Sequence, residues 1–192
     1  FIVENTLDAL WAHARSHLNK MPATRVALTG SSGKTTTKEL IKQALVACLC
    51  ADQVFATSGN FNNHIGVPLS ALLVRPEHKV AVFELGMNHF GEMAQLTRLV
   101  DPDVGLIINI GTAHAGNLGG IEGVARAKGE LFENLKADAV AIVNNDDYRC
   151  VKVSEEFLGD KFSFGKSIES NLNLIESKEV GDKIQLEFSY RD

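Results

Sequence analysis

The sequence has little cysteine and no long hydrophobic segment, and each absence narrows the class of protein. Cys48, Cys50 and Cys150 show no metal-ligand spacing, so we expect free thiols in a reducing compartment rather than a disulfide framework. No apolar run approaches the roughly 18 residues that a membrane-spanning helix needs. The first residues also lack the basic-then-apolar order of a signal peptide. We therefore expect a cytoplasmic protein.

A large excess of charge of one sign is also lacking. The formal net charge is −5, which gives no electrostatic attraction to nucleic acid or to an anionic membrane, and we expect neither as a partner. Hydrophobic residues make up 45% of the chain and charged residues 22%, which is ordinary for a soluble globular protein. An anionic ligand would therefore need positive groups placed locally.

Patterns typical of strands and of helices alternate through the middle of the chain. We predict strands at 25–28, 53–57, 79–85, 104–110 and 139–143. We predict helices at 39–49, from 66 onward, at 91–100 and at 121–135. Because the strands are near-continuous runs of Val, Ile and Ala, we expect them to be buried on both faces of a parallel sheet. Helices between such strands indicate a doubly wound, mostly parallel α/β fold.

The N-terminal end of the chain stands apart from this pattern. Residues 7–18 place apolar side chains on one helical face. Pro22 separates this helix from the first strand, so we expect residues 1–21 to be a linker or a remnant helix of a preceding domain. Since the first residue is Phe1 rather than Met, we expect the true start of the protein to lie upstream.

The C-terminal end predicts strands with little helix between them. These strands lie at 161–164, 172–177 and 183–190. Gly181-Asp182 marks a hairpin turn between the last two. Apolar and polar residues alternate in the last strand, which is typical of a sheet with one face in water. We therefore expect a small antiparallel β region that continues beyond the end of this chain.

The most informative segment is Thr29–Thr35, which reads TGSSGKT and follows the predicted strand at 25–28. Strand, glycine turn, Lys-Thr and helix is the order of a phosphate-binding loop. Glycines let successive N–H groups point at one anion, and the helix adds the positive end of its dipole. In such a loop Lys34 reaches the β- and γ-phosphates and the Thr35 hydroxyl ligates Mg²⁺. Leu28 stands where the usual pattern has a glycine, and the alternative is a glycine-rich surface turn.

Polar residues follow the carboxyl end of each predicted strand, which is where open α/β sheets bind ligands. Glu84 ends an apolar strand, and an acid buried there needs a cation or hydrogen-bond donors to stay ionised. It is either an Mg²⁺ ligand or an acid that pairs with a lysine or caps a turn. Asn60, Asn62 and Asn63 either turn the chain or donate to phosphate oxygens. Asn144 begins a run that either caps the next helix or contacts a base or ribose.

A histidine and a lysine are candidates for metal chemistry. His114 lies in a glycine-rich loop and is either a surface residue or a metal ligand; His64 and His89 lie in similar loops. Lys128 lies within an apolar helical stripe. Either its stem is buried while the amine reaches water, or the amine is partly desolvated, has a lowered pKa and is nucleophilic when neutral. Such an amine can add CO₂ to form a carbamate, which is an anionic metal ligand.

Four strings together resemble the Mur ligase family, which builds the peptide stem of bacterial peptidoglycan. They are TGSSGKT (29–35), GNFNNHIGVP (59–68), ELGMNHFGE (84–92) and ARAKGELF (125–132). The second and third strings are most similar to the member that adds D-alanyl-D-alanine to UDP-N-acetylmuramoyl-tripeptide. The resemblance spans residues 25–147, and the family's loop also lacks the first glycine. It implies that residues 22–192 form the central ATP-binding domain, incomplete at its C-terminus.

The resemblance also implies a role for each candidate residue. Thr35 and Glu84 match the ligands of a first Mg²⁺. His114 matches the histidine of a second metal, and Lys128 matches the carbamoylated lysine; together with Lys34 these two are the implied catalytic residues. The implied nucleotide-binding residues are Gly30, Ser31, Ser32, Gly33, Lys34, Thr35, Thr36, Asn60, Asn63 and Asn144. Asn60 or Asn63 would lie near the γ-phosphate, and Asn144 near the adenine. Ala115–Gly120 departs from the family, because a larger residue and an acid are expected after the histidine.

The implied reaction is ATP-dependent amide formation in the bacterial cytoplasm. The tripeptide carboxylate attacks the γ-phosphorus to give an acyl phosphate and ADP, and the amine of D-Ala-D-Ala then displaces phosphate. Because carboxylate and γ-phosphate are both anions, two Mg²⁺ ions and Lys34 must neutralise them. N- and C-terminal domains of the same protein are implied partners. Without them we expect this chain to bind ATP weakly and not to ligate.

Two other readings of the sequence stay open at this point. The first is a sister amide ligase, either the Mur enzyme that adds the third stem residue or a folylpolyglutamate synthetase. The second is a non-catalytic nucleotide-binding module or a simple NTPase. Glu84, His114 and Lys128 discriminate against the second, since a plain NTPase needs neither a second metal nor a carbamate.

Overall fold

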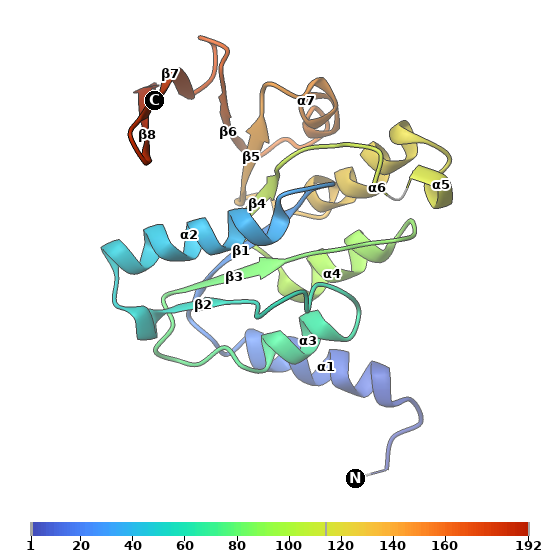
Figure 1. Ribbon diagram of the computed structural model, residues 1–192. Coiled ribbons are helices and arrows are strands. Elements are labelled where there is room, and N and C mark those ends of the chain that lie inside the picture. Colours follow the sequence, from blue (N-terminus) through green and yellow to red (C-terminus); the bar gives the residue numbers. More distant parts are fainter. Residues whose placement is uncertain (1, 114, 192) are drawn as a thin grey trace.

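Helices and strands alternate along the chain in the computed structural model, which describes residues 2–113 and 115–191 (Figure 1). In order they are α1 (Thr6–Leu18), β1 (Thr24–Thr29), α2 (Lys34–Cys48), the 3₁₀ turn η1 (Ala51–Gln53), β2 (Val54–Ala56), α3 (Gly66–Ala71), β3 (Val80–Glu84), α4 (Glu92–Val100), β4 (Val104–Ile107), α5 (Ala115–Leu118), α6 (Ile121–Glu133), β5 (Val140–Asn144), α7 (Tyr148–Ser154), β6 (Asp160–Gly165), β7 (Leu172–Val180) and β8 (Lys183–Tyr190). None of the helices in these ranges is both long and apolar enough to cross a lipid bilayer.

Within the described ranges, the strands form one eight-stranded sheet in the order β2-β3-β1-β4-β5-β6-β7-β8. Neighbouring strands from β2 through β7 pair in parallel, and β7 and β8 pair antiparallel. The predicted doubly wound, mostly parallel α/β fold with a small antiparallel end is therefore confirmed. One detail of the prediction is wrong, because β6 belongs to the parallel part of the sheet rather than to the antiparallel end.

Two element boundaries differ from the predicted ones next to the phosphate-binding loop. Helix α2 begins at Lys34 rather than at residue 39, because the polar residues of its first turn carry no apolar period. Strand β4 ends at Ile107 rather than at residue 110. The Ile108 N–H still donates to the Thr29 carbonyl oxygen at 2.9 Å, after which the chain turns toward the loop. Both differences bring additional polar groups to the carboxyl end of β1.

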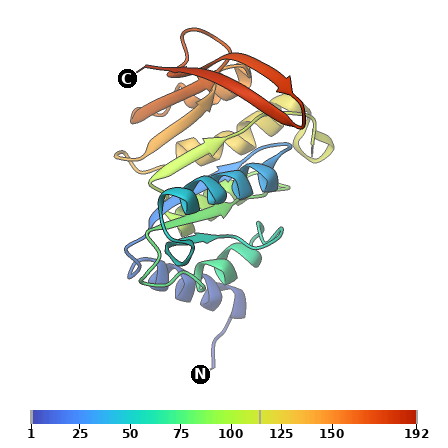
Figure 2. The same ribbon diagram turned by 60° about the vertical axis from the view of Figure 1, so that its left-hand side comes forward.

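The sheet is covered by helices on both faces. Helix α2 packs against β1, β2 and β3, and its Ile41 and Leu45 contact a core cluster that contains Leu28 (Figure 2). Helices α4, α6 and α7 pack against the opposite face, where Ala27 belongs to the larger core cluster. Because successive side chains of a strand point to opposite faces, Leu28 and Ala27 bury β1 from both sides, as the continuous apolar pattern predicted.

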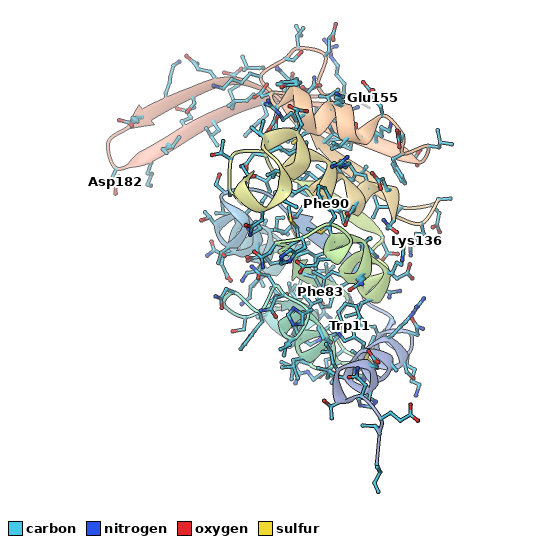
Figure 3. All side chains as sticks on the ribbon, turned by 90° about the vertical axis from the view of Figure 1, so that its right-hand side faces the viewer. Trp11, Phe83, Phe90, Lys136, Glu155 and Asp182 are labelled. Atoms are coloured by element: carbon cyan, nitrogen blue, oxygen red, sulfur yellow. The ribbon has the colours of Figure 1, made fainter. Side chains whose placement is uncertain are left out.

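Helix α1 packs onto the same body as the other helices. The Asn5 side chain accepts the Leu7 N–H at 2.9 Å and so caps the helix start. Ala14 and Leu18 are buried in the larger core, and the helix contacts α3 and α4. Trp11, labelled in Figure 3, donates from its indole Nε1 to the His64 carbonyl oxygen at 2.8 Å. The N-terminal helix is thus attached to the loop that leads into α3.

The β7–β8 hairpin extends away from the body, with Asp182 at its tip (Figure 3). Gly181 has φ of +65°, which suits the predicted two-residue turn. Ile184, Leu186 and Phe188 are 68%, 49% and 48% exposed. The prediction of one covered face for this strand is therefore not met by the part of the chain that the structure describes.

Candidate active site

The loop at residues 30–33 lies at the carboxyl end of β1, between β3 and β4. After β1 the chain forms β2 and β3 on one side of β1 and then crosses to form β4 on its other side. The direction in which strands are added therefore reverses at β1, and ligands bind at such switch points in open α/β sheets. Gly33 has φ of +75°, which favours glycine, and directly precedes the N-terminus of α2. Lys34 folds back so that its Nζ donates to the Gly30 carbonyl oxygen at 2.9 Å. Thr36, the next candidate on this turn, is exposed.

Lys128 reaches the same carbonyl oxygen from α6. Its Nζ donates to the Gly30 oxygen at 3.1 Å, and the residue is only 1% exposed. Burial, together with the positive charge of Lys34, lowers the pKa of Lys128 to about 8. The alternative of an amine that reaches water is therefore excluded. The structure thus brings together two lysines that are far apart in the sequence. Lys128 loses its proton at a lower pH than an ordinary lysine does.

Glu84 lies at the end of β3, the strand that pairs with β1, and is 1% exposed. Its Oε2 accepts the Thr35 hydroxyl at 3.0 Å, and its Oε1 accepts the Asn62 side-chain amide at 2.9 Å. Carboxylate and hydroxyl oxygens are ligands that Mg²⁺ accepts. The donor set therefore fits a Mg²⁺ ion beside the loop, with Thr35 and Glu84 as the residues that would hold it.

Lys38 is a charged residue of this site that the sequence reasoning missed. It is fully buried, and its Nζ donates to the Gly59 carbonyl oxygen at 3.0 Å. The same nitrogen lies 3.7 Å from Glu84 Oε2 and 3.3 Å from Glu39 Oε1. Glu84 therefore also pairs with a lysine, as one of the two sequence interpretations proposed. The signal was weak, because Lys38 follows three threonines and precedes a glutamate.

The three asparagines of the 58–64 loop separate into different roles. Asn62 contacts Glu84. Asn63 holds the turn that leads into α3, because its Oδ1 accepts the N–H groups of Ile65 and Gly66 at 3.0 and 2.8 Å. Asn60 is exposed. The sequence selected Asn60 and Asn63, but the side chain that reaches the buried carboxylate is Asn62.

Asn144 lies at the end of β5 and connects two neighbouring loops. Its Nδ2 donates to the Ile108 carbonyl oxygen at 2.8 Å, and its Oδ1 accepts the Asp146 N–H at 2.9 Å. Asp147 caps α7 through the Arg149 N–H at 3.0 Å. The capping interpretation of this run therefore applies to Asp147, and Asn144 holds the edge of the sheet beside the loop.

The two histidine candidates that the structure describes, His64 and His89, are exposed. His114 lies outside the described residues. His89 is on the surface, where its Nδ1 lies 3.0 Å from Glu92 Oε1. His64 contributes its backbone carbonyl to Trp11. Across residues 2–113 and 115–191, no group of three or more His, Cys, Asp or Glu side chains is arranged to hold a metal ion.

A cavity of about 420 Å³ opens beside the two lysines. It is lined by Trp11, Lys34, Asn62, Asn63, His64, Gly86, Met87, Asn88, His89, Glu92, Gln95, Leu96 and Lys128. A larger hollow of about 760 Å³ between α1 and α4 shares Trp11, His64, Glu92 and Gln95 with it. Lys34 and Lys128 therefore line a space with room for a small organic anion.

Comparison with known proteins places this site in a family. The sequence profile described as "Mur ligase middle domain" matches residues 28–191. The chain is 42% identical over 146 residues to the UDP-N-acetylmuramoyl-tripeptide–D-alanyl-D-alanine ligase of Bacillus subtilis, which covers 76% of this chain and 31% of that protein. The chain thus spans about a third of the length of this curated relative.

Solved structures give the same result. The crystal structure of the MurF ligase from Thermotoga maritima in complex with ADP is 33% identical, with a TM-score of 0.88, and the match covers 99% of this chain and 43% of that one. The FolC of E. coli, in complex with DHPP and ADP, is 19% identical with a TM-score of 0.69, over 99% of this chain and 51% of that one, so it shares the fold. The phosphate-binding loop, the buried acid at the end of β3 and the profile match all lead to one conclusion: this chain belongs to the Mur ligase family, as a middle domain.

Proposed function

We propose that this chain is the central ATP-binding domain of an amide ligase that joins D-Ala-D-Ala to UDP-N-acetylmuramoyl-tripeptide. One observation carries the proposal: two lysine amines meet at the Gly30 carbonyl, while Thr35, next to Lys34, contacts the buried Glu84. The similarity to the UDP-N-acetylmuramoyl-tripeptide–D-alanyl-D-alanine ligase of Bacillus subtilis supports this substrate pair. Residues 22–192 are the proposed domain, and residues 1–21 the proposed link to a preceding one.

The proposed reaction proceeds in two steps. The terminal carboxylate of the tripeptide attacks the γ-phosphorus of ATP, the bond to the β,γ-bridging oxygen breaks, and ADP leaves. The amine of D-Ala-D-Ala then attacks the acyl phosphate carbon through a tetrahedral intermediate. The new amide forms as inorganic phosphate leaves and the amine nitrogen gives up its proton. Because the substrates are a nucleotide and a nucleotide-linked peptide, we place the reaction in the bacterial cytoplasm, with the other domains of the same protein as partners.

The loop residues have a direct role in this chemistry. Lys34 is free to exchange the Gly30 oxygen for a phosphate oxygen, which places a cation where two anions must meet. Thr35 and Glu84 would hold Mg²⁺, which supplies further positive charge to the phosphates. The proposed contacts of Asn60 or Asn63 near the γ-phosphate, and of Asn144 near the adenine, rest on the family resemblance.

Lys128 is proposed to carry a carbamate. Its lowered pKa leaves more neutral amine near neutral pH than an ordinary lysine has. The neutral amine adds CO₂ and releases a proton, which turns the cation beside Lys34 into an anion. That change removes the repulsion between the buried Lys128 ammonium group and the partly buried one of Lys34, and it creates a metal ligand, with His114 as the proposed second ligand. The test is ¹³C NMR with ¹³C-labelled bicarbonate: wild-type protein should show a carbamate signal that K128M lacks.

The ligase proposal is tested by product formation in the full-length protein. ATP, Mg²⁺ and UDP-N-acetylmuramoyl-tripeptide are incubated with D-Ala-D-Ala, and amide product and ADP are measured. The same assay tests the two sister ligases. For the Mur enzyme that adds the third stem residue, the substrates are that amino acid and an acceptor whose peptide is one residue shorter. For a folylpolyglutamate synthetase, they are a folate and glutamate. Product only with D-Ala-D-Ala supports the proposal. ADP release without any amide would instead support a simple NTPase and contradict it.

A further inference from the structure

Asn109 lies just beyond the end of β4 and contacts the first half of the phosphate-binding loop. Its Oδ1 accepts the backbone N–H groups of Ser31 and Ser32 at 3.1 and 3.0 Å. Its Nδ2 donates to the Ser32 carbonyl oxygen at 3.2 Å. The Ser32 hydroxyl lies 3.4 Å from the same Oδ1. Both ends of one carboxamide are therefore used on two adjacent loop residues.

The backbone beside Asn109 continues this contact. The Asn109 carbonyl oxygen also accepts the Ser31 N–H at 3.0 Å. Two residues further on, the Gly111 N–H donates to Ser31 Oγ at 2.7 Å, and Ser31 Oγ donates to the Gly111 carbonyl oxygen at 3.2 Å. A Cβ on Gly111 would lie 3.4 Å from Ser31 Cβ, so the two segments are in close contact. Residues 109–111 and 31–32 thus form one hydrogen-bonded unit.

This unit determines which loop N–H groups remain for a ligand. The N–H groups of Ser31 and Ser32 point at a protein oxygen, so the loop is held in its turned shape from the side of β4. The N–H groups at the start of α2 follow directly, and a helix N-terminus favours an anion. A loop held in shape before the nucleotide arrives loses less conformational entropy on binding, and the affinity is higher for that reason.

We propose that Asn109 is a positioning residue that preorganises the phosphate-binding loop for ATP. The inference rests on the proposed function, because it takes ATP as the ligand of the loop. Asn109 acts through Ser31 and Ser32 and does not touch the phosphates. The N109A variant removes every side-chain contact. The N109D variant keeps oxygens for the two N–H groups, loses the donor to the Ser32 carbonyl and brings a negative charge toward an anion site.

The experiment measures ATP affinity in the full-length protein by calorimetry with Mg²⁺ present. We expect N109A to bind ATP at least tenfold more weakly than wild type, and N109D more weakly still. In steady-state assays KM for ATP should rise while KM for D-Ala-D-Ala stays within twofold, which general loss of structure would not produce. Asn134→Ala is the matched control, because this carboxamide also uses both ends, accepting from Arg98 Nε at 2.9 Å and donating to the Glu130 carbonyl at 2.8 Å, at the far end of α6. Its ATP affinity should equal that of wild type.

The proposal fails if N109A and N109D bind ATP within twofold of wild type. Amide hydrogen exchange in the wild-type protein without nucleotide gives a second measurement that needs no folded variant. Protection of the Ser31 and Ser32 amides supports the proposed role of Asn109, and exchange at the rate of an unprotected amide overturns it. If wild type itself binds no ATP, the proposed function falls, and that result is distinct from a wild type that binds ATP and is indifferent to Asn109.

Discussion

Lys38 and Glu84 form an ion pair of 3.7 Å between two side chains that are 0% and 1% exposed. A buried charge that loses its partner is strongly destabilising. We therefore expect K38M to lower the free energy of unfolding of this chain by about 3–5 kcal/mol, measured by urea denaturation. E39Q is the control: the Glu39 side chain is 46% exposed, so its loss should cost under about 1 kcal/mol. A K38M protein as stable as wild type would contradict the importance of this pair.

The coupling of the two residues is measured with the double variant. K38M and E84Q each leave one buried polar or charged group without its partner, whereas K38M/E84Q removes both charges. The double-mutant cycle should give a coupling free energy on the order of 2 kcal/mol. Additive effects of the two substitutions would show that Lys38 is held by the Gly59 carbonyl instead.

The lowered pKa of Lys128 predicts a pH-dependent stability. The unfolded chain has a lysine pKa near 10.5, and the folded chain about 8. Between these values the unfolded state binds more protons, so the stability of the folded state rises with pH. The unfavourable contribution of the charged amine, on the order of 3 kcal/mol, is fully present below pH 8 and is lost as pH approaches 10.5.

The K128M variant isolates this contribution. It should be more stable than wild type at pH 7, and the difference should shrink at pH 9.5. Urea denaturation at both values in CO₂-free buffer gives the comparison, because carbamate formation would otherwise change the charge of wild type. An equal difference at the two pH values would show that the Lys128 proton is not responsible.

Gly86 leaves the space that Asn62 needs to reach Glu84. A Cβ at position 86 would lie 2.9 Å from the Asn62 Cγ and Oδ1 atoms, so G86A should push this side chain off the carboxylate. We expect Mg·ATP affinity to fall about fivefold, which corresponds to about 1 kcal/mol for one hydrogen bond, with little change in unfolding. In the N62A background the clash is absent, and G86A should have no further effect. A full effect of G86A in that background would assign it to another cause.

Trp11 is the single tryptophan of the sequence, and it lines the cavity beside Lys34 and Lys128. Its indole also holds the His64 carbonyl at the end of the loop that carries Asn62. Binding of UDP-N-acetylmuramoyl-tripeptide in this cavity should therefore change the tryptophan emission. The titration is monitored as the difference in fluorescence between the full-length protein and its W11F variant, with D-Ala-D-Ala alone as the comparison. Unchanged emission at saturating acceptor, as judged by calorimetry, would place the acceptor elsewhere.

The sequence predicted the parts of this site that carry a pattern. TGSSGKT between a strand and a helix located the loop, and the apolar run before Glu84 located a buried acid at the end of β3. The stripe around Lys128 predicted a buried stem, and only packing could decide whether the amine was buried too. The structure shows that the amine is buried, where it donates to the Gly30 carbonyl oxygen.

Other residues carried no periodic signal, so the sequence left Lys38 unnoticed and did not identify the contacts of Asn109 and Asn62. Lys38 sits in a run of polar residues at the start of α2, where a buried and an exposed lysine look alike. Asn109 was predicted both as part of the strand, because Ile108 and Ile110 on either side of it continue the apolar pattern, and as the first residue of the polar segment at the end of that strand, with no role of its own. The sequence could not decide which of Asn60, Asn62 and Asn63 contacts Glu84. The direction of each side chain in a loop depends on backbone turns that sequence alone does not determine.

The site also has a consequence for how the protein reaches its native state. Its contacts join segments far apart: Lys128 and Gly30 are separated by 98 residues, Asn109 and Ser32 by 77, and Thr35 and Glu84 by 49. Non-local parallel pairings form late, because loop closure must precede them. A chain captured before β3 and β4 have joined β1 therefore has no complete nucleotide pocket. Binding of ATP during refolding would show that β1, β3 and β4 have paired. The nucleotide would then stabilise the native state relative to the partly folded states, which lack the pocket.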